Sequence, residues 1–500
     1  MDINIPPIKI SHILWTCLIG ALLIRAFYRR WKHQKIYSFM ASLPGPVSLP
    51  FIGASFFLLG ISSTNICSKL KRFVKKYPGV AVFWEREEPH LLTSSREVCN
   101  AVLSSGNVEK FYHYRLFQFA TKSMFSANGT EWRTLRNIVN PAFRTHVLMQ
   151  SDDNLDHHVK IFVNQLQRHV SDDGFDIFVP VHLCTLDMIC DNMLGARLCN
   201  QENRSALMCN SLTEWAEMTF ERTFSFWPDF YYALSGQGNA TNKLININHN
   251  LIYEMVEQRI RKRKALLKES QHSENSRIYI DFLLDNLDAG VLTKDQIISE
   301  MLEIFVAGSI TTAITNAWVF KLLALYPDIQ ERAYQEIKEN CVDGEVRLNE
   351  LSKLIYTEMI IKETLRHVGI PFTGRYITED VQVDEKMTIP AGMNLLICLH
   401  ELHHDPKYWQ RPGKFYPEHF SPANEKARPK GAFIPFMSGP RVCPGNKYAM
   451  RSMKLLVAST LLRYKFSTDE KPTDDLRDMD HRLVFMLFPA SGFNVKIQHR

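Results

Sequence analysis

A cysteine near the carboxyl end of the chain stands in a setting that suits a metal ligand. Cys443 lies in the run FMSGPRVCPG, residues 436–445, and a helical stretch is predicted directly after it, from about Asn446 to Tyr464. A thiol at a helix amino terminus is favoured as the thiolate, because the helix dipole and unpaired backbone N–H groups stabilise negative charge. Phe436 would supply an aromatic wall beside the sulfur, and Arg441 offers a guanidinium for an acidic group. The alternative is a loop that contains an ordinary buried cysteine.

The composition excludes several other classes of protein. Of the 500 residues, 45% are apolar and 22% are charged, as in a globular chain rather than a disordered, collagenous or coiled-coil one. The other nine cysteines form no CxxC pair and no clustered Cys/His spacing, so neither a zinc finger nor a disulfide framework is expected. The net charge is +6, and nearly all of that excess lies in the first forty residues. Because the rest of the chain has no basic excess for phosphates, nucleic-acid binding is not expected.

The spacing of Phe436, Gly439, Arg441, Cys443 and Gly445 resembles the haem-thiolate signature of the cytochrome P450 monooxygenases. The resemblance extends over nearly the whole chain, and within the family the chain is similar to the animal lipid-ω-hydroxylase clan and its insect members. The resemblance implies the cytochrome P450 fold and haem b (iron protoporphyrin IX) as the cofactor. Cys443 would be the axial iron ligand, whose thiolate pushes electron density toward the iron and favours O–O cleavage.

Further residues match cofactor-binding positions of the family. Trp132 and Arg136 match its WxxxR helix, which implies that the arginine contacts a haem propionate. Arg375 lies where a second propionate-binding arginine is usual, and Phe436 and Arg441 complete the implied cofactor site. Outside this resemblance, a tryptophan and an arginine four residues apart indicate only an amphipathic helix face.

Glu363 and Arg366 match the ExxR motif of the family, which implies a buried ion pair that braces the haem-binding core. The third member of that brace is usually an arginine in a PxRF segment, whereas residues 417–420 of this chain carry His419 in that place. Because the unperturbed pKa of histidine is near 6.5, the brace would rely more on hydrogen bonding than on charge. The alternative for a pair at this spacing is a solvated helix face.

A long helix is predicted between Thr293, which forms a capping box with Gln296, and Pro327, which ends it. Its middle, residues 307–312, contains Gly308, and glycine costs a helix about 1 kcal/mol relative to alanine. The missing side chain would let a flat group lie against the helix.

The resemblance gives this helix a role in oxygen activation. Thr311 matches the catalytic threonine that orders water near the bound oxygen, but Ile310 stands where the family usually has an acid. Since isoleucine cannot relay a proton, slower turnover or peroxide release is expected. Phe305, Ala307 and Ile310 are predicted to line the substrate chamber. Some relatives attach haem covalently through a glutamate, and Ala307 replaces it here, so that ester is not expected.

The amino terminus has the features of a membrane anchor. Residues 10–24 are mostly apolar and would rise about 22 Å as a helix, against a hydrocarbon core of about 30 Å. Three further apolar residues lengthen the span if Arg25 snorkels, and the basic residues that follow favour a cytosolic body. We therefore predict one N-terminal transmembrane helix in an anchor and basic juxtamembrane segment, residues 1–42, and an endoplasmic reticulum location. The alternatives are a cleaved signal peptide and a mitochondrial presequence with a mitochondrial location.

The rest of the chain, residues 43–500, is predicted to be one monooxygenase domain. Helical periodicity dominates between residues 95 and 370, and short β-rich runs occur near residues 80–93, 387–399 and 483–497. The fold class is therefore mainly α with a small β portion.

Together these features predict a haem-thiolate monooxygenase that inserts one oxygen atom from O2 into an apolar small molecule, such as a lipid, a hormone or a xenobiotic. No GxGxxG motif lies in a strand-turn-helix context, so the electrons of NADPH would come through a separate protein. The resemblance implies NADPH-cytochrome P450 reductase as that partner, with cytochrome b5 as a second one. The alternatives are a haem-dependent isomerase or dehydratase of lipid peroxides and a non-catalytic haem-binding protein.

Overall fold

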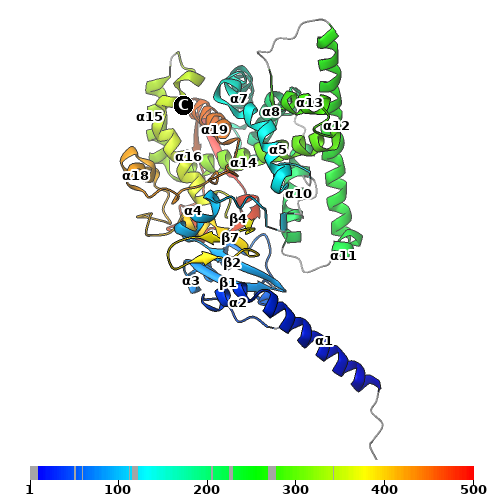
Figure 1. Cartoon of the computed structure of the whole chain (residues 1–500). Helices are drawn as coiled ribbons and strands as arrows, with labels where there is room; N and C mark the ends of the chain where they lie inside the picture. Colours follow the sequence, from blue (N-terminus) through cyan, green and yellow to red (C-terminus); the bar gives the residue numbers. More distant parts are fainter. Residues whose placement is uncertain are drawn as a thin grey trace, which may run out of the picture.

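The computed structural model describes residues 10–49, 52–58, 60–111, 113–114, 122–203, 207–223, 229–268, 277–341 and 343–500. Its helices are α1 (Ile10–Lys32), α2 (Gln34–Ala41), α3 (Ile66–Lys76), α4 (Arg96–Ser104), α5 (Gly129–Val139), α6 (Thr145–Met149), α7 (Asp152–Leu166), α8 (Phe178–Ile189), α9 (Asn200–Asn203), α10 (Leu207–Thr223), α11 (Asp229–Leu234), α12 (Gly236–Lys268), α13 (Tyr279–Asp288), α14 (Lys294–Leu325), α15 (Pro327–Asn340), α16 (Ile355–Val368), α17 (Leu399–Leu402), α18 (Pro422–Ala427) and α19 (Asn446–Arg463). Its strands are β1 (Val80–Glu85), β2 (Glu88–Thr93), β3 (Phe175–Asp176), β4 (Phe372–Tyr376), β5 (Val381–Gln382), β6 (Thr388–Ile389), β7 (Asn394–Cys398), β8 (Tyr464–Ser467), β9 (His481–Val484), β10 (Met486–Pro489) and β11 (Asn494–His499). Helices make up most of the body, as predicted (Figure 1).

The main sheet is four-stranded, in the order β1-β2-β7-β4. The hairpin of β1 and β2 pairs Val80 with Thr93, β2 runs parallel to β7, and β4 is antiparallel to β7. Each of the three predicted β-rich runs contains strands, but β3, β4, β5 and β8 were not predicted. β4 follows α16 closely and reads FTGRY, which is too short for an alternation of apolar and polar residues to be recognised.

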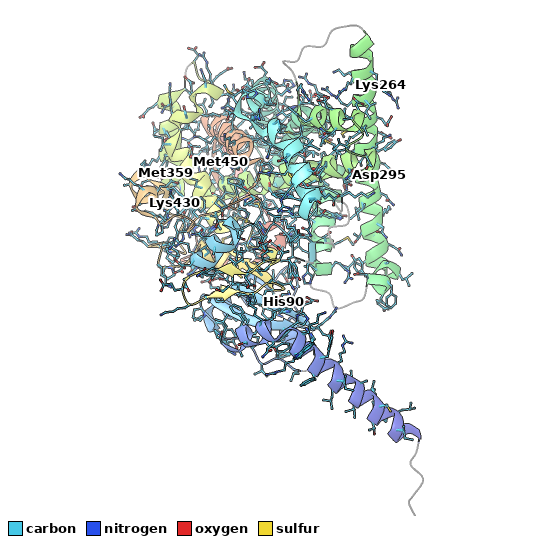
Figure 2. All side chains as sticks on the ribbon, viewed as in Figure 1. His90, Lys264, Asp295, Met359, Lys430 and Met450 are labelled. Carbon is cyan, nitrogen blue, oxygen red and sulfur yellow. The ribbon has the colours of Figure 1, made fainter. Side chains whose placement is uncertain are left out.

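Helix α14 is the centre of the body and packs against α8, α16 and α19. It begins as predicted: the Thr293 backbone N–H donates to Gln296 Oε1 at 2.9 Å, and Thr293 Oγ1 accepts from the Gln296 N–H. Among the described helices, α14 alone is long and apolar enough to cross a membrane, but 67% of its most apolar window is buried. It is therefore a core helix, around which side chains fill the body (Figure 2).

Helix α1 projects from the body beside the β1–β2 hairpin (Figure 1). Its apolar side chains are exposed, among them Leu14, Leu23 and Phe27. Arg25 forms an ion pair with Glu87 at 2.6 Å, which links α1 to the hairpin. Residues 1–9 of the predicted anchor segment lie outside the described residues.

Helix α2 belongs to the body, although it falls within the predicted segment 1–42. Its Ile36 and Met40 are buried in a cluster with one face of the main sheet and with α4. A second, larger cluster surrounds α14 and forms the main core.

Candidate active site

A cavity of about 400 Å³ lies between α14, the main sheet and the loop before α19. It joins predicted site residues that are far apart in the sequence: Trp132, Arg136, Ala307, Thr311, Phe436, Arg441 and Cys443. The volume is within the range of small-molecule and cofactor sites.

The loop before α19 holds Cys443 at the cavity wall. The Cys443 backbone N–H donates to the Phe436 carbonyl at 2.9 Å, which closes the loop. Gly439 adopts a φ of 72°, and an added Cβ would lie only 1.7 Å from the Leu103 carbonyl oxygen on α4. Only glycine therefore fits where this loop crosses α4.

The prediction that the helix terminus alone favours the Cys443 thiolate was incomplete. Burial raises the pKa of the Cys443 thiol, and the backbone N–H of Gly445 and the charge of Arg136 lower it only in part. A buried thiol without a cation keeps its proton, whereas a coordinating metal ion displaces it. The sulfur therefore fits a metal ligand better than a free nucleophile.

Three basic side chains, Lys110, Arg136 and Arg441, line the cavity, and a fourth, Arg375, acts on Lys110 and Arg441 through its charge. Arg441 donates to the backbone carbonyls of Val108 at 2.8 Å and Met124 at 3.1 Å, and its guanidinium lies 4.5 Å from the centre of the Trp132 ring. Burial, together with the charge of Arg375, lowers the pKa of Arg441 to about 9.

Arg375 is buried and donates to the Gly374 carbonyl at 2.9 Å, but it does not itself line the cavity. Arg136 lines the cavity beside Cys443, and burial lowers its pKa. Sequence reasoning missed Lys110, whose ammonium lies 4.1 Å from the centre of the Tyr114 ring. Burial, then the charges of Arg375 and Arg441, lower the pKa of Lys110 well below its ordinary value. No motif surrounds this lysine, so only the fold reveals it.

None of the four cations, Lys110, Arg136, Arg375 and Arg441, forms an ion pair within the described part of the chain. Buried charges without partners are costly, so the cavity suits an anionic ligand. The two propionates of a haem whose iron lies at Cys443 meet that requirement.

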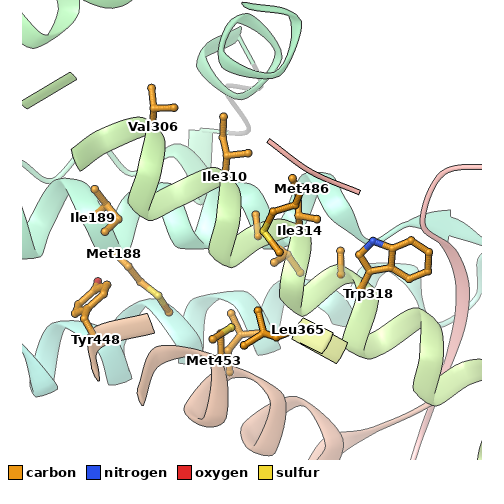
Figure 3. Close-up of a cluster of buried hydrophobic side chains, with 14 of the residues drawn as sticks. Met188, Ile189, Val306, Ile310, Ile314, Trp318, Leu365, Tyr448, Met453 and Met486 are labelled. Atoms are coloured by element: carbon orange, nitrogen blue, oxygen red, sulfur yellow. The ribbon is translucent and has the colours of Figure 1, made fainter. Parts of the chain in front are cut away.

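Helix α14 forms a wall of the cavity through Ala307 and Thr311, as predicted. Thr311 Oγ1 donates to the Ala307 carbonyl at 2.6 Å. The prediction for Phe305 and Ile310 was wrong, because both side chains are fully buried and do not line the cavity. Ile310 lies in an apolar cluster on another side of the helix (Figure 3).

Gly308 serves helix packing as well as the cavity. A Cβ added there would lie 2.5 Å from Ile189 Cδ1 on α8. The expectation that the glycine makes room for a flat ligand therefore gives only part of the reason, because α8 also requires its small size.

The predicted brace is buried. Arg366 donates to Glu363 through Nη2 at 2.7 Å and Nε at 2.9 Å, and it also donates to the carbonyls of His403 and Pro412. His419 Nδ1 lies 3.2 Å from both carboxylate oxygens of Glu363. Burial alone would raise the pKa of Glu363, but Arg366 and the neighbouring histidines outweigh it and hold that pKa well below its ordinary value.

A second histidine of the brace was not predicted. His367 Nε2 lies 3.3 Å from Glu363 Oε1, on the next residue after the ExxR motif. Burial, and then the charge of Arg366, lower the pKa of His367 to about 4. The brace therefore has two imidazoles where one arginine is usual, and the predicted reliance on hydrogen bonding has a geometric basis.

A half-buried cysteine just before a helix, in one cavity with a long core helix and basic side chains, fits a haem-thiolate protein. The profile of the family described as Cytochrome P450 matches residues 43–497. The chain belongs to the cytochrome P450 family, its cofactor is haem, and it is a monooxygenase.

Similar proteins include insect and mammalian members of the family. "Cytochrome P450 4c3" of Drosophila melanogaster is 25% identical over 97% of this chain and 94% of its own length. "Cytochrome P450 4V2" of Mus musculus is 28% identical over 86% of this chain and 82% of its own length. "Cytochrome P450 4c21" of Blattella germanica is 26% identical over 93% and 95%, respectively. The predicted similarity to an animal clan with insect members is therefore confirmed.

Proposed function

We propose that the protein inserts one oxygen atom from O2 into an apolar lipid, hormone or xenobiotic, with electrons that NADPH supplies through NADPH-cytochrome P450 reductase. Cytochrome b5 is a second electron donor in this proposal. The supporting observation is the cavity, in which Cys443 and Thr311 line the same space as apolar side chains from several elements. Those apolar residues are Phe220, Ile304, Leu396, Leu483 and Phe485.

Bound haem supplies the chemistry of O2 activation. In this proposal Cys443 ligates the iron, and Phe436 covers the sulfur. Trp132, Arg136 and Arg441 hold the propionates, Lys110 adds a fourth contact, and the buried Arg375 acts on Arg441 through its charge. No carboxylate lies within ion-pair distance of these side chains in the described residues, although Glu303 acts on Lys110 and Arg441 from farther away, and this supports propionates as their close partners.

The side chains of the chamber orient the substrate and exclude water. Apolar walls bind an apolar molecule by removing its surface from water, at roughly 25 cal/mol per Å². Thr311, whose hydroxyl proton is engaged with the Ala307 carbonyl, presents its oxygen lone pairs as an acceptor for water. Ala307 has a small side chain, so this part of the α14 wall leaves space for the substrate beside Thr311.

Helix α1 acts as the membrane anchor in this proposal, with the body at the cytosolic face of the endoplasmic reticulum. Exposed apolar side chains on α1 and basic residues at its end, Arg29, Arg30 and Lys32, support that orientation. The proposed division is an anchor segment, residues 1–42, and a monooxygenase domain, residues 43–500.

The function is tested on the full chain with reductase in lipid vesicles. The reduced carbon monoxide complex should give the difference spectrum of thiolate-ligated haem, and Cys443→Ser should lose it. NADPH-dependent products from an apolar substrate panel then identify the monooxygenase substrate. Product formed from a lipid hydroperoxide without NADPH would favour an isomerase or dehydratase, and spectral shifts without any product would favour a binding protein.

A further inference from the structure

The proposed oxygenation consumes two protons for each oxygen atom that leaves as water, and position 310 does not supply them. Ile310 has no ionisable group, and its side chain is fully buried in the core (Figure 3). An acid substituted there would be buried among apolar side chains, at a cost of several kcal/mol. The protons must therefore reach Thr311 from another group.

Glu303 lies on the same face of α14 as Ala307 and Thr311, at spacings of four and eight residues. All three residues line the cavity, and Ala307 lies one turn from each of the other two. The distance from Glu303 to Thr311 along the helix axis is about 12 Å. A proton crosses such a distance only through cavity water, for which the small Ala307 side chain leaves space.

Protein donors hold the Glu303 carboxyl at the cavity wall. The backbone N–H of Phe125 donates to Glu303 Oε2 at 2.6 Å. One turn earlier on α14, Glu300 is fully buried, and the Tyr279 hydroxyl donates to Glu300 Oε2 at 3.1 Å. The backbone N–H of Met124 also donates to Glu300. Both carboxyl groups thus accept hydrogen bonds from the segment 124–125, and of the two only Glu303 lines the cavity.

Burial raises the pKa of both carboxyl groups, and their mutual repulsion raises the pKa of Glu300 further. Charged and titratable groups on other elements also act on the two carboxyl groups. The charges that act on the pair are Lys110 before α5, Glu131 and Arg136 on α5, Tyr279 on α13, and Arg441 in the cysteine loop. Lys110 and Arg441 lower the pKa of Glu303 only in part. Burial and the neighbouring carboxyl group therefore favour the protonated form within the pair, whereas Lys110 and Arg441 oppose it at Glu303.

We propose that Glu303 supplies protons to the cavity and that Glu300 reloads it, which replaces the acid missing at position 310. This inference rests on the proposed monooxygenase function, which provides the O2 and the NADPH electrons. The O–H bond of the Glu303 carboxyl breaks, and its proton passes through cavity water to the water molecule that donates to Thr311 Oγ1, while that water passes one of its own protons on within the cavity. The Glu303 carboxylate then takes the proton of Glu300, and because Glu300 is fully buried, the proton that restores the pair enters from cavity water through Glu303.

The test compares Glu303→Gln with the wild-type full chain in the vesicle system. The amide keeps the size of the side chain and an oxygen acceptor for the Phe125 N–H but has no acidic proton. We expect about tenfold less product per NADPH, a matching rise in peroxide, a larger solvent deuterium effect and an altered pH profile of turnover. Glu303→Asp should restore part of the product yield. Glu350→Gln, a buried carboxyl that does not line the cavity, is the control and should behave as the wild type.

A second measurement does not need turnover. Infrared spectra at neutral pH should show the C=O band of a protonated carboxyl group in the wild type, and this band should shift or disappear in Glu303→Gln and Glu300→Gln. Absence of the band in the wild type, or unchanged product yield, isotope effect and pH profile in Glu303→Gln, overturns the inference. A wild-type chain that shows the band but oxidises no substrate contradicts the proposed function instead.

Discussion

Arg366 illustrates how burial changes the contribution of a single residue to stability. Its guanidinium and the carboxylate of Glu363 are both fully buried, and each group has several hydrogen-bond partners. The same sequence spacing on a helix surface stabilises by only about 0.2 to 0.5 kcal/mol. In the core the pair matters because losing one partner leaves the other as an isolated charge.

Arg366→Ala should therefore lower the free energy of unfolding by about 3 to 5 kcal/mol and reduce haem retention. Urea titration and haem content after purification measure both effects. The control is Lys362→Ala, which removes a partly exposed partner of Glu358 and should cost less than about 1 kcal/mol. Equal losses in the two variants would contradict the buried brace.

His182 on α8 is fully buried, and neither ring nitrogen has a hydrogen-bond partner in the described part of the chain. Burial lowers its pKa from 6.5 to about 3. Between these values the unfolded chain binds a proton that the folded protein does not, so stability is lost as the pH falls below 6.5.

His182→Phe should remove this contribution. Between about pH 6 and pH 4, the slope of the free energy of unfolding against pH should then be smaller by about 1.4 kcal/mol per pH unit. At neutral pH the variant should be at least as stable, because an unsatisfied polar group has been removed. Unfolding midpoints in urea across this pH range measure the slope. The exposed His146→Gln serves as the control, and an unchanged slope in His182→Phe would refute the prediction.

At the scale of elements, the cysteine loop depends on its contact with α4. Gly439 has a left-handed φ and lies against the Leu103 carbonyl, whereas Gly445 has a φ of −80° and space for a methyl group, 3.9 Å from Cys443 Sγ. The two glycines of one motif therefore have different physical roles.

Gly439→Ala should displace the loop from α4, because the new methyl group overlaps a backbone atom that cannot rotate away. We expect most of the haem to be lost, with a destabilisation above about 3 kcal/mol. Gly445→Ala should keep its haem and the carbon monoxide spectrum of the wild type. The haem content and the carbon monoxide spectrum of both variants test this prediction. Similar haem content in the two variants would rule out the proposed contact between the loop and α4.

At the scale of the whole molecule, the boundary between the exposed helix and the packed body lies between α1 and α2. The apolar side chains of α1 are exposed, while Ile36 and Met40 of α2 are part of the core. Burial of one such side chain contributes about 1.5 to 3 kcal/mol.

A chain without residues 1–32 should leave the membrane fraction and retain haem, because α2 still covers the sheet. A chain without residues 1–42 should also leave the membrane but unfold at lower urea, since the sheet loses Ile36 and Met40. Fractionation and urea titration of both deletions check this. Membrane retention of the shorter deletion would show that α1 is not the main anchor.

The sequence by itself determined the chemistry and the long elements. A cysteine with fixed neighbours, a capping box at Thr293 and sustained helical periodicity are local signals, so they predicted the haem ligand, α14 and the helical class. Short strands such as β4 were not predictable, because five residues carry too little pattern.

Only the tertiary structure decided which side chains meet at the cavity. It placed Phe305 and Ile310 in the core, and it brought Lys110 and Glu303 to the wall although neither belongs to a motif. It also raised the pKa of Cys443 where the helix terminus alone predicted the reverse. The physical reason is common to these cases: burial and the charges of distant segments depend on packing, which no local spacing of residues encodes.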